Sequence, residues 1–377
     1  MVILTVMEGS CQLLAQGDIT ERNCMIRKFK TPISGKVVNI GSEAGYDQII
    51  LATETSCDET AAAIVVNGRH VLSNVVASQI ETHKKYGGVV PEVAAREHLE
   101  SINMVVEEAV EKSGIKLNEI TAFAATVGPG LVGALLVGLN TAKSLSLVYD
   151  KPFLGVNHLN AHVCANYLSS ENEDPNTWEP PFVCLLISGG HTQIIRVNSY
   201  CDQELIGETL DDAVGEAYDK VARLLKLPYP GGPLLDKMAQ TGNKDRFKFT
   251  EAKVGEYDFS FSGLKTAVLR LVQSFDGQEL PKEDIAASFQ EAVSTTLLKK
   301  TLKAAKDSGI NQITLAGGVA ANSEIRKKFF SLENIGFKIH APALKYCTDN
   351  AAMVASSAYF LSNVMEELDI EVFSRVK

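Results

Sequence analysis

The feature that most constrains this chain is a strand–turn–strand plan that occurs twice. Residues 47–78, "DQIILATETSCDETAAAIVVNGRHVLSNVVAS", alternate β-branched apolar runs with polar turns. Residues 180–209, "PPFVCLLISGGHTQIIRVNSYCDQELIGET", repeat the plan with "SGGHT" as the turn. Two similar openings predict two halves of one duplicated architecture. The prolines of "NTWEPP", residues 176–181, suit a joint between the halves.

Helical patterns fill most of the remaining chain. Two long segments with an apolar stripe should end at Gly114 and at Gly309. A closing helix is expected after Thr348, which would be its N-cap, with Asp349 in its first turn. Because strands alternate with helices, the predicted fold class is α/β.

Composition limits the classes to which the chain can belong. Its 377 residues, 45% hydrophobic and 22% charged, suffice for two cores and two domains. No apolar run approaches the roughly 20 residues of a membrane span, so no membrane contact is expected. The seven cysteines form no CxxC pair, which is typical of reduced thiols in a cytoplasm. A net charge of −10 repels phosphate, so contact with nucleic acid needs a local basic patch or a partner.

Three glycine-containing turns follow apolar strands: "GPGLVGALLVG", "ISGGHT" and "AGGVAAN". Glycine lets backbone N–H groups approach anionic oxygens closely. None of the turns is a Walker A loop, GxxxxGK[ST]. Together with the duplicated plan they favour a nucleotide between two lobes. Asp219 and Asp236 flank the turn "YPGGP" and are candidate ribose ligands, although a solvated surface acid is the default reading of either.

The segment "NHLNAH" places His158 and His162 about one helical turn apart, so both rings would lie on one helix face. They are either packed core histidines or two ligands of a metal. The glutamate of an HExxH motif is absent, which removes the base of a metalloprotease. Asp349, at the expected positive end of the closing helix, is the best third ligand. Two imidazoles and one carboxylate suit Fe(II), or Zn(II), with positions left open for a substrate.

Ten motifs occur in the order seen in one protein family: "ETSCDET", "GGVVPEVAAREH", "GPGLVGALLVG", "NHLNAH", "LLISGGHTQ", "DDAVGEAYDK", "YPGGP", "FSFSGLKTA", "AGGVAAN" and "CTDNAAMVA". On these motifs, residues 48–377 resemble the bacterial-type TsaD family, whose members are tRNA N6-adenosine threonylcarbamoyltransferases and were once described as O-sialoglycoprotein endopeptidases. The resemblance implies a duplicated actin-like and Hsp70-like ATPase fold, with two lobes around a nucleotide cleft. The expected domains are an N-terminal extension at 1–47, lobe I at 48–178, lobe II at 179–345, and a closing helix at 346–377 that returns to lobe I.

The resemblance also implies a metal-dependent acyltransferase. Threonylcarbamoyl would pass from threonylcarbamoyl-AMP to N6 of the adenosine at tRNA position 37, 3′ to the anticodon, in tRNAs reading codons that begin with A. The implied partners are tRNA, an inactive paralogue of the same fold and a small P-loop ATPase. The expected location is the cytoplasm, with an organelle of bacterial origin as the alternative.

Residue by residue, the family's motifs fall on two sets of positions. The implied ligands of one Fe²⁺ per subunit, with Zn²⁺ as the alternative, are His158, His162 and Asp349. The implied contacts to the substrate are Ile187, Ser188, Gly189, Gly190, His191, Asp219, Gly232, Asp236 and Asn322.

Three other functions compete with this one. A metal-dependent peptidase needs a base beside the metal, and none is apparent in the sequence. A sugar or acetate kinase of the same fold has no use for two histidines and an aspartate that bind metal. A non-catalytic nucleotide-binding scaffold could lose these three residues freely, whereas this chain has all of them.

Overall fold

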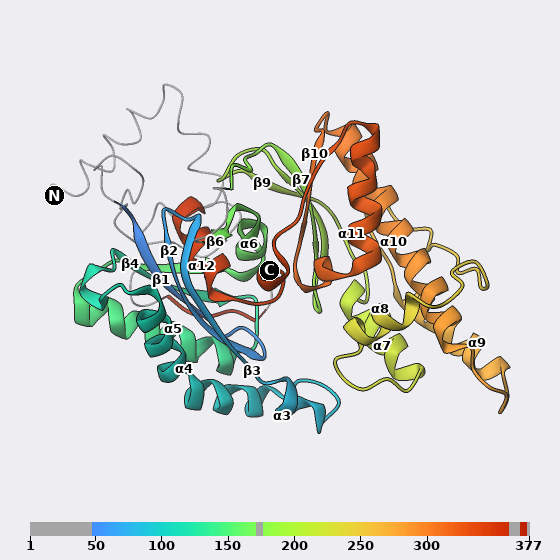
Figure 1. Cartoon of the computed structure of the whole chain (residues 1–377), viewed down its shortest axis with the longest axis horizontal. Helices are drawn as coiled ribbons and strands as arrows, with labels where there is room; N and C mark the ends of the chain where they lie inside the picture. Colours follow the sequence, from blue (N-terminus) through green and yellow to red (C-terminus); the bar gives the residue numbers. More distant parts are fainter. Residues whose placement is uncertain (1–46, 171–175, 362–369, 375–377) are drawn as a thin grey trace.

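The structure is a computed structural model that describes residues 47–170, 176–361 and 370–374 (Figure 1). Apart from Asp47, the extension expected at 1–47 lies outside the described residues. The first half is built on a six-stranded sheet in the order β5-β4-β1-β2-β3-β6. Its strands are β1 (Ile49–Glu54), β2 (Glu59–Val66), β3 (His70–Ser78), β4 (Ala122–Gly128), β5 (Phe153–Asn157) and β6 (Ser169–Ser170).

The second half is built on a five-stranded sheet in the order β11-β10-β7-β8-β9. Its strands are β7 (Phe182–Ile187), β8 (Thr192–Val197), β9 (Gln203–Glu208), β10 (Gln312–Ala316) and β11 (Lys338–His340). In each sheet the first three strands along the chain, β1–β3 or β7–β9, pair antiparallel with one another. The next strand, β4 or β10, pairs in parallel with the first, and β5 or β11 pairs in parallel with that strand. The predicted duplication and the α/β class are therefore confirmed.

The first sheet is covered on both faces. Alternate residues of β1 point to opposite sides: Leu51 packs with α4 (Pro91–Ser113) and α5 (Val132–Tyr149), whereas Ile50 packs with α6 (His158–Cys164) and α12 (Ala351–Leu361). Figure 1 shows α12, coloured red, among the blue strands of the first half although it is the last helix described. The end of the described chain thus completes the core of its beginning.

The second sheet packs one face on α7 (Val214–Leu224), α8 (Gly231–Ala239), α10 (Lys282–Asp307) and α11 (Ser323–Phe330). Two further helices are α3 (Ile80–Lys84) in the first half and α9 (Ser262–Ser274) in the second. The other face of the second sheet packs on Leu159 and Val163 of α6. Because Ala161 of the same helix belongs to the core of the first sheet, α6 lies between the two halves.

The helix ends match the sequence prediction at two places and differ at a third. Helix α4 ends before Gly114, and α10 ends just before Gly309; both glycines have a positive φ of 68° and 67°. The closing helix, however, begins at Ala351, and its N-terminal cap is the buried Asn350, whose Oδ1 accepts from Met353 N at 3.1 Å. The prediction of Thr348 as the cap was wrong, and Asp349 precedes the helix instead of lying in its first turn.

Helix α5 is apolar and 18 residues long, so in the described part of the chain one helix has the length and composition to cross a membrane. The sequence analysis expected no run close to that length. Its residues Val137 and Leu139 are buried against the first sheet, and the helix contacts β4 and α4. These contacts make it a core helix of the first half.

Candidate metal and substrate site

Asn157, the residue before helix α6, fixes where the helix begins. Asn157 ends β5, and its Oδ1 accepts from Leu159 N at 2.9 Å and from Asn160 N at 3.2 Å, so the helix begins at His158 directly after the strand. The four-residue spacing then places His158 and His162 on one face, as predicted. Their ring centroids lie 4.7 Å apart.

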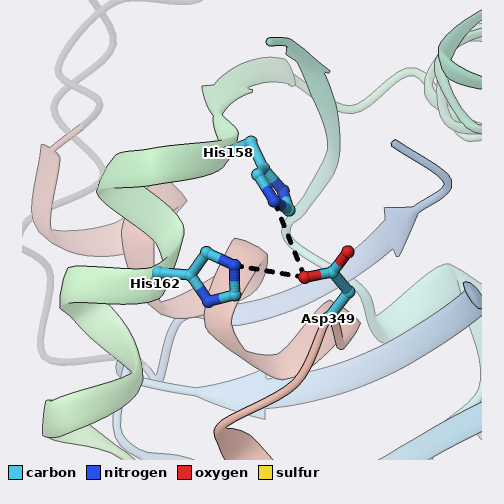
Figure 2. A group of neighbouring side chains, drawn as sticks. All are labelled: His158, His162 and Asp349. Atoms are coloured by element: carbon cyan, nitrogen blue, oxygen red, sulfur yellow. Dashed lines mark ion pairs between the residues drawn. The ribbon is translucent and has the colours of Figure 1, made fainter. Parts of the chain in front are cut away.

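Asp349 reaches these two rings from the segment that precedes α12 (Figure 2). Its Oδ1 lies 3.1 Å from Nε2 of His162 and 3.6 Å from Nε2 of His158. One ligand atom from each residue lies within 4.8 Å of the other two. The structure therefore brings together the three residues that the sequence proposed as metal ligands.

The environment of these side chains fits a divalent cation. His162 is fully buried, and among the described residues its ring nitrogens make no well-aligned hydrogen bond, although Nε2 lies 3.1 Å from Asp349 Oδ1. A buried polar atom without a partner is costly, and a cation bound at Nε2 would remove that cost. Two imidazoles and one carboxylate form a donor set that also leaves coordination positions open. That these residues bind a metal stays a prediction.

Sequence reasoning missed a buried carboxylate beside this group. Glu54, the last residue of β1, is fully buried, and its Oε2 lies 3.2 Å from Nδ1 of His158. The hydroxyl of Ser56 also lies 3.2 Å from Nδ1. One signal in the sequence could have pointed to Glu54, because it is the only charged residue of the strand "IILATE".

Electrostatics within the group are strong because the charges are buried together. Burial alone would raise the pKa of Asp349. The opposite effect of the two histidines is larger in sum, and it lowers the pKa from 3.8 to about 2. Burial lowers the pKa of His158, but the carboxylates of Asp349 and Glu54 raise it to about 9. Both shifts share a cause, the close approach of two carboxylates to the imidazole of His158.

The turn between β7 and β8 lies close to these charges. Ser188 N donates to His191 O at 2.9 Å, and His191 N donates to Ser188 Oγ at 3.1 Å, which closes the turn. Burial, and after it the neighbouring rings of His158 and His162, lower the pKa of His191 to about 4. Gly189 and Gly190 are exposed, and among the described residues no atom lies within 4 Å of a Cβ added to either. Ile187, just before the turn, is buried in the core.

The other predicted substrate contacts cap helices of the second half. Asp219 Oδ1 accepts from Gly231 N at 2.9 Å and from Gly232 N at 3.1 Å, at the N-terminus of α8. Asp236 accepts from Ser323 N at 3.0 Å, at the start of α11. These structural bonds do not test whether the two acids also contact a ribose, and that role stays a prediction.

Asn322 is the N-cap of α11, since its Oδ1 accepts from Ile325 N at 3.0 Å. Its amide group donates to Gln290 Oε1 at 2.9 Å, and the side chain is nearly buried. A contact of this residue with the substrate likewise stays a prediction.

Two duplicated α/β halves with a His–His–Asp group at their junction define a protein of the actin-like ATPase fold with a candidate metal centre. The chain is similar to the solved structure of full-length HypF in a phosphate- and nucleotide-bound form, with a TM-score of 0.56 and 15% identity, over 83% of this chain and 46% of that one. HypF of T. kodakarensis gives a TM-score of 0.57 and 16% identity, over 84% and 49%. At these identities the likeness shows the fold alone.

Sequence comparison narrows this class to one family. The family model "TsaD: tRNA N6-adenosine threonylcarbamoyltransferase" matches residues 70–356. A relative of that name from Rippkaea orientalis is 56% identical over 82% of this chain and 90% of its own length. Another, from Thermosipho africanus, is 53% identical over 83% and 94%. The chain belongs to the TsaD family of tRNA N6-adenosine threonylcarbamoyltransferases and is a transferase of that family.

Proposed function

We propose that this chain transfers threonylcarbamoyl from threonylcarbamoyl-AMP to N6 of the adenosine at tRNA position 37, in tRNAs reading codons that begin with A. The observation that carries the proposal is the His158–His162–Asp349 group beside the open turn at 188–191, in a chain of this family. Adenine N6 is a weak nucleophile, because its lone pair is delocalised into the ring. The site must therefore make the attacked carbonyl more electrophilic.

A Fe²⁺ ion bound by His158, His162 and Asp349, with Zn²⁺ as the alternative, would supply Lewis-acid chemistry for the donor. The chain's own contribution is binding and orientation. Backbone N–H groups of Gly189 and Gly190 are proposed to face the phosphate of the adenylate, where they stabilise the charge that grows as AMP departs. Asp219, Gly232, Asp236 and Asn322 are proposed to bind the nucleoside part of the donor.

Glu54 does not restore the peptidase alternative. A peptidase needs a carboxylate that can activate water beside the metal. Both oxygens of Glu54 are engaged, because Oε1 accepts from Ser56 N at 2.6 Å and Oε2 accepts from Thr126 Oγ1 at 2.5 Å. Its environment supports a structural carboxylate at the site instead of a base.

An apolar surface on the first half supports a protein partner. Helices α4 and α5 form a groove of about 570 Å³ that includes Leu99 and Leu136, which are 63% and 41% exposed. Leu147 and Val148 of α5 are 65% and 76% exposed. Exposed apolar surface of this kind marks interaction sites. The proposed occupant is the inactive paralogue, with a small P-loop ATPase as the further helper and the cytoplasm as the location.

The function is tested by incubating the chain and its helper proteins with threonylcarbamoyl-AMP and unmodified tRNA, followed by nucleoside analysis of the tRNA. The expected product is N6-threonylcarbamoyladenosine, and none should form on a tRNA in which that adenosine is replaced by guanosine. Absence of the product with folded components, or peptide hydrolysis in its place, would contradict the proposal.

Binding of the donor is tested separately with Asp219→Asn. A hydrogen bond to a charged group contributes roughly 1.5–3 kcal/mol, so affinity for the donor should fall about ten-fold to a hundred-fold. Asp212→Asn is the matched control, since Asp212 pairs with Lys220 on the surface. Calorimetry with a non-hydrolysable analogue of the donor measures the affinity of both variants. Thermal melting checks that loss of the Asp219 carboxylate at the N-terminus of α8 does not unfold the protein. Equal affinity of the two variants would remove Asp219 from the site.

A further inference from the structure

The buried carboxylate of Glu54 has a complete set of partners. Oε1 accepts from Ser56 N at 2.6 Å, Oε2 accepts from Thr126 Oγ1 at 2.5 Å, and Oε2 lies 3.2 Å from Nδ1 of His158. The side chain is fully buried at the end of β1. A charge in that position is tolerated only where such partners surround it, so its direction is fixed by β1, β4 and α6 together.

The two ring nitrogens of His158 face different groups. Nδ1 faces Glu54 and the hydroxyl of Ser56, each at 3.2 Å. Nε2, on the other side of the ring, faces Asp349 at 3.6 Å. Within the described residues His162 has no comparable support, because its Nδ1 lacks a hydrogen-bond partner. The two histidines are therefore held in different ways.

We infer that Glu54 is a positioning residue of the cation site: its carboxylate accepts a hydrogen bond from Nδ1–H of His158 and thereby directs the lone pair of Nε2 toward the cation. Histidines that bind metals commonly donate their second N–H to a carboxylate, which fixes the tautomer and the orientation of the ring. The inference rests on the proposed function only through the cation site. Its consequence is that β1, which carries Glu54, contributes to how strongly the site binds a metal.

Glutamine in place of Glu54 reverses the hydrogen bond at nearly constant shape. Its amide group would donate to Nδ1 where the carboxylate accepts, and that favours the tautomer in which Nε2 carries the proton. A protonated Nε2 has no lone pair for a cation. The substitution thus removes the hydrogen-bond acceptor at Nδ1 while it leaves the volume of the side chain nearly unchanged.

The test measures Co²⁺ and Zn²⁺ binding by metal-free protein, using calorimetry and the visible spectrum of bound Co²⁺. Glu54→Gln should bind each ion about ten-fold to a hundred-fold more weakly than the natural chain. Ser56→Ala removes the other group at Nδ1 but keeps the carboxylate, and its affinity should stay within about three-fold of the natural one. Nitrogen-15 spectra of labelled histidine should show an Nδ1–H in the Zn²⁺-loaded natural protein and its loss in Glu54→Gln.

A second measurement separates positioning from a general loss of structure. In a His158→Ala background, Glu54→Gln should weaken the remaining metal affinity no further, since Glu54 acts through that ring. A full additional loss would overturn the inference, as would natural affinity in the single variant Glu54→Gln. If the natural chain binds metal and Glu54→Gln binds it equally, only this inference fails. If the natural chain binds neither ion, the proposed cation site fails with it.

Discussion

The turn after β1 and the turn after β7 occupy equivalent places in the two halves, but they differ in how closely they are packed. In the first half, Thr55 and Ser56 are buried: Thr55 Oγ1 donates to Ala134 O at 2.8 Å, and Ser56 O accepts from Leu131 N at 2.8 Å. In the second half, Gly189 and Gly190 are exposed and have no neighbour within 4 Å of an added Cβ among the described residues. One turn is packed and the other is open.

The difference indicates how a duplicated fold can divide one reaction between its halves. The packed turn lies beside Glu54, which contacts His158, so it supports side chains proposed to bind a cation. Gly189 and Gly190 of the open turn are exposed, which suits the proposed binding of an anionic donor. The same strand order thus carries a packed turn in one half and an open turn in the other.

A methyl group that meets the packed turn should have a different effect from one placed in the open turn. Gly130, in the segment between β4 and α5, faces Ser56 of the packed turn, whereas Gly189 belongs to the open turn. A Cβ on Gly130 would lie 2.7 Å from the backbone oxygen of Ser56, whereas a Cβ on Gly189 would meet nothing. Gly130→Ala should therefore lower the free energy of unfolding by about 1–3 kcal/mol through overpacking. Gly189→Ala should change it by no more than about 0.5 kcal/mol.

Urea unfolding of both glycine variants, with metal removed, provides the measurement. Donor affinity gives a second contrast, since Gly189→Ala should weaken it while the fold is preserved. Equal destabilisation of the two variants would show that the turns do not differ in packing, and the comparison would fail.

A smaller effect is expected from an exposed acid of the second half. Asp211 accepts from Ser260 Oγ at 2.5 Å, Ser262 Oγ at 2.7 Å and Phe261 N at 2.8 Å, at the start of α9. Partial burial raises its pKa, but the hydrogen bonds from Ser260 and Ser262 outweigh this and lower it below the ordinary value of 3.8. Unlike the buried Glu54, this carboxylate remains in contact with solvent.

The sign of the pH dependence follows from the lowered pKa. The stabilisation is present above the ordinary pKa and disappears as the pH falls through the lower value of the folded state. Asp211→Asn should cost about 1 kcal/mol at pH 7, and the difference from the natural chain should shrink as the pH falls below about 4. Urea titrations at pH 7 and at pH 3 measure both. A difference that stays constant across this range would exclude the charge as its source.

The sequence predicted those features of the fold that depend on local pattern. Repeated β-branched runs indicated two sheets, and glycines with a positive φ marked the ends of α4 and α10. The predicted start of α12 was wrong because Thr348 and Asn350 are both residue types that commonly cap a helix, so the sequence does not choose between them. Asn350 forms the cap because it is buried and its Oδ1 meets Met353 N, a contact that sequence pattern does not reveal.

The site was predictable where chemistry limits the choice of residue. Two histidines at helical spacing needed a third ligand. Asp349 was chosen because it was expected at the positive end of the closing helix, and the motif resemblance implied the same residue. Glu54 was missed because an acid at the end of a strand resembles an acid in the following turn, and its place as the only charged residue of "IILATE" is a weak signal. Only the pairing of β1 with β4, which brings Thr126 to it, shows that the carboxylate is buried.

The central claim is that His158, His162 and Asp349 bind one cation on which transfer depends. Metal content and threonylcarbamoyl transfer, measured together for the three alanine variants and the His158→Ala/Asp349→Ala double variant, test it most directly. Each single change should remove most metal and most transfer, and the second change should add little, because ligands of one ion do not act independently. Transfer at the natural rate by protein verified to contain no metal would contradict the account.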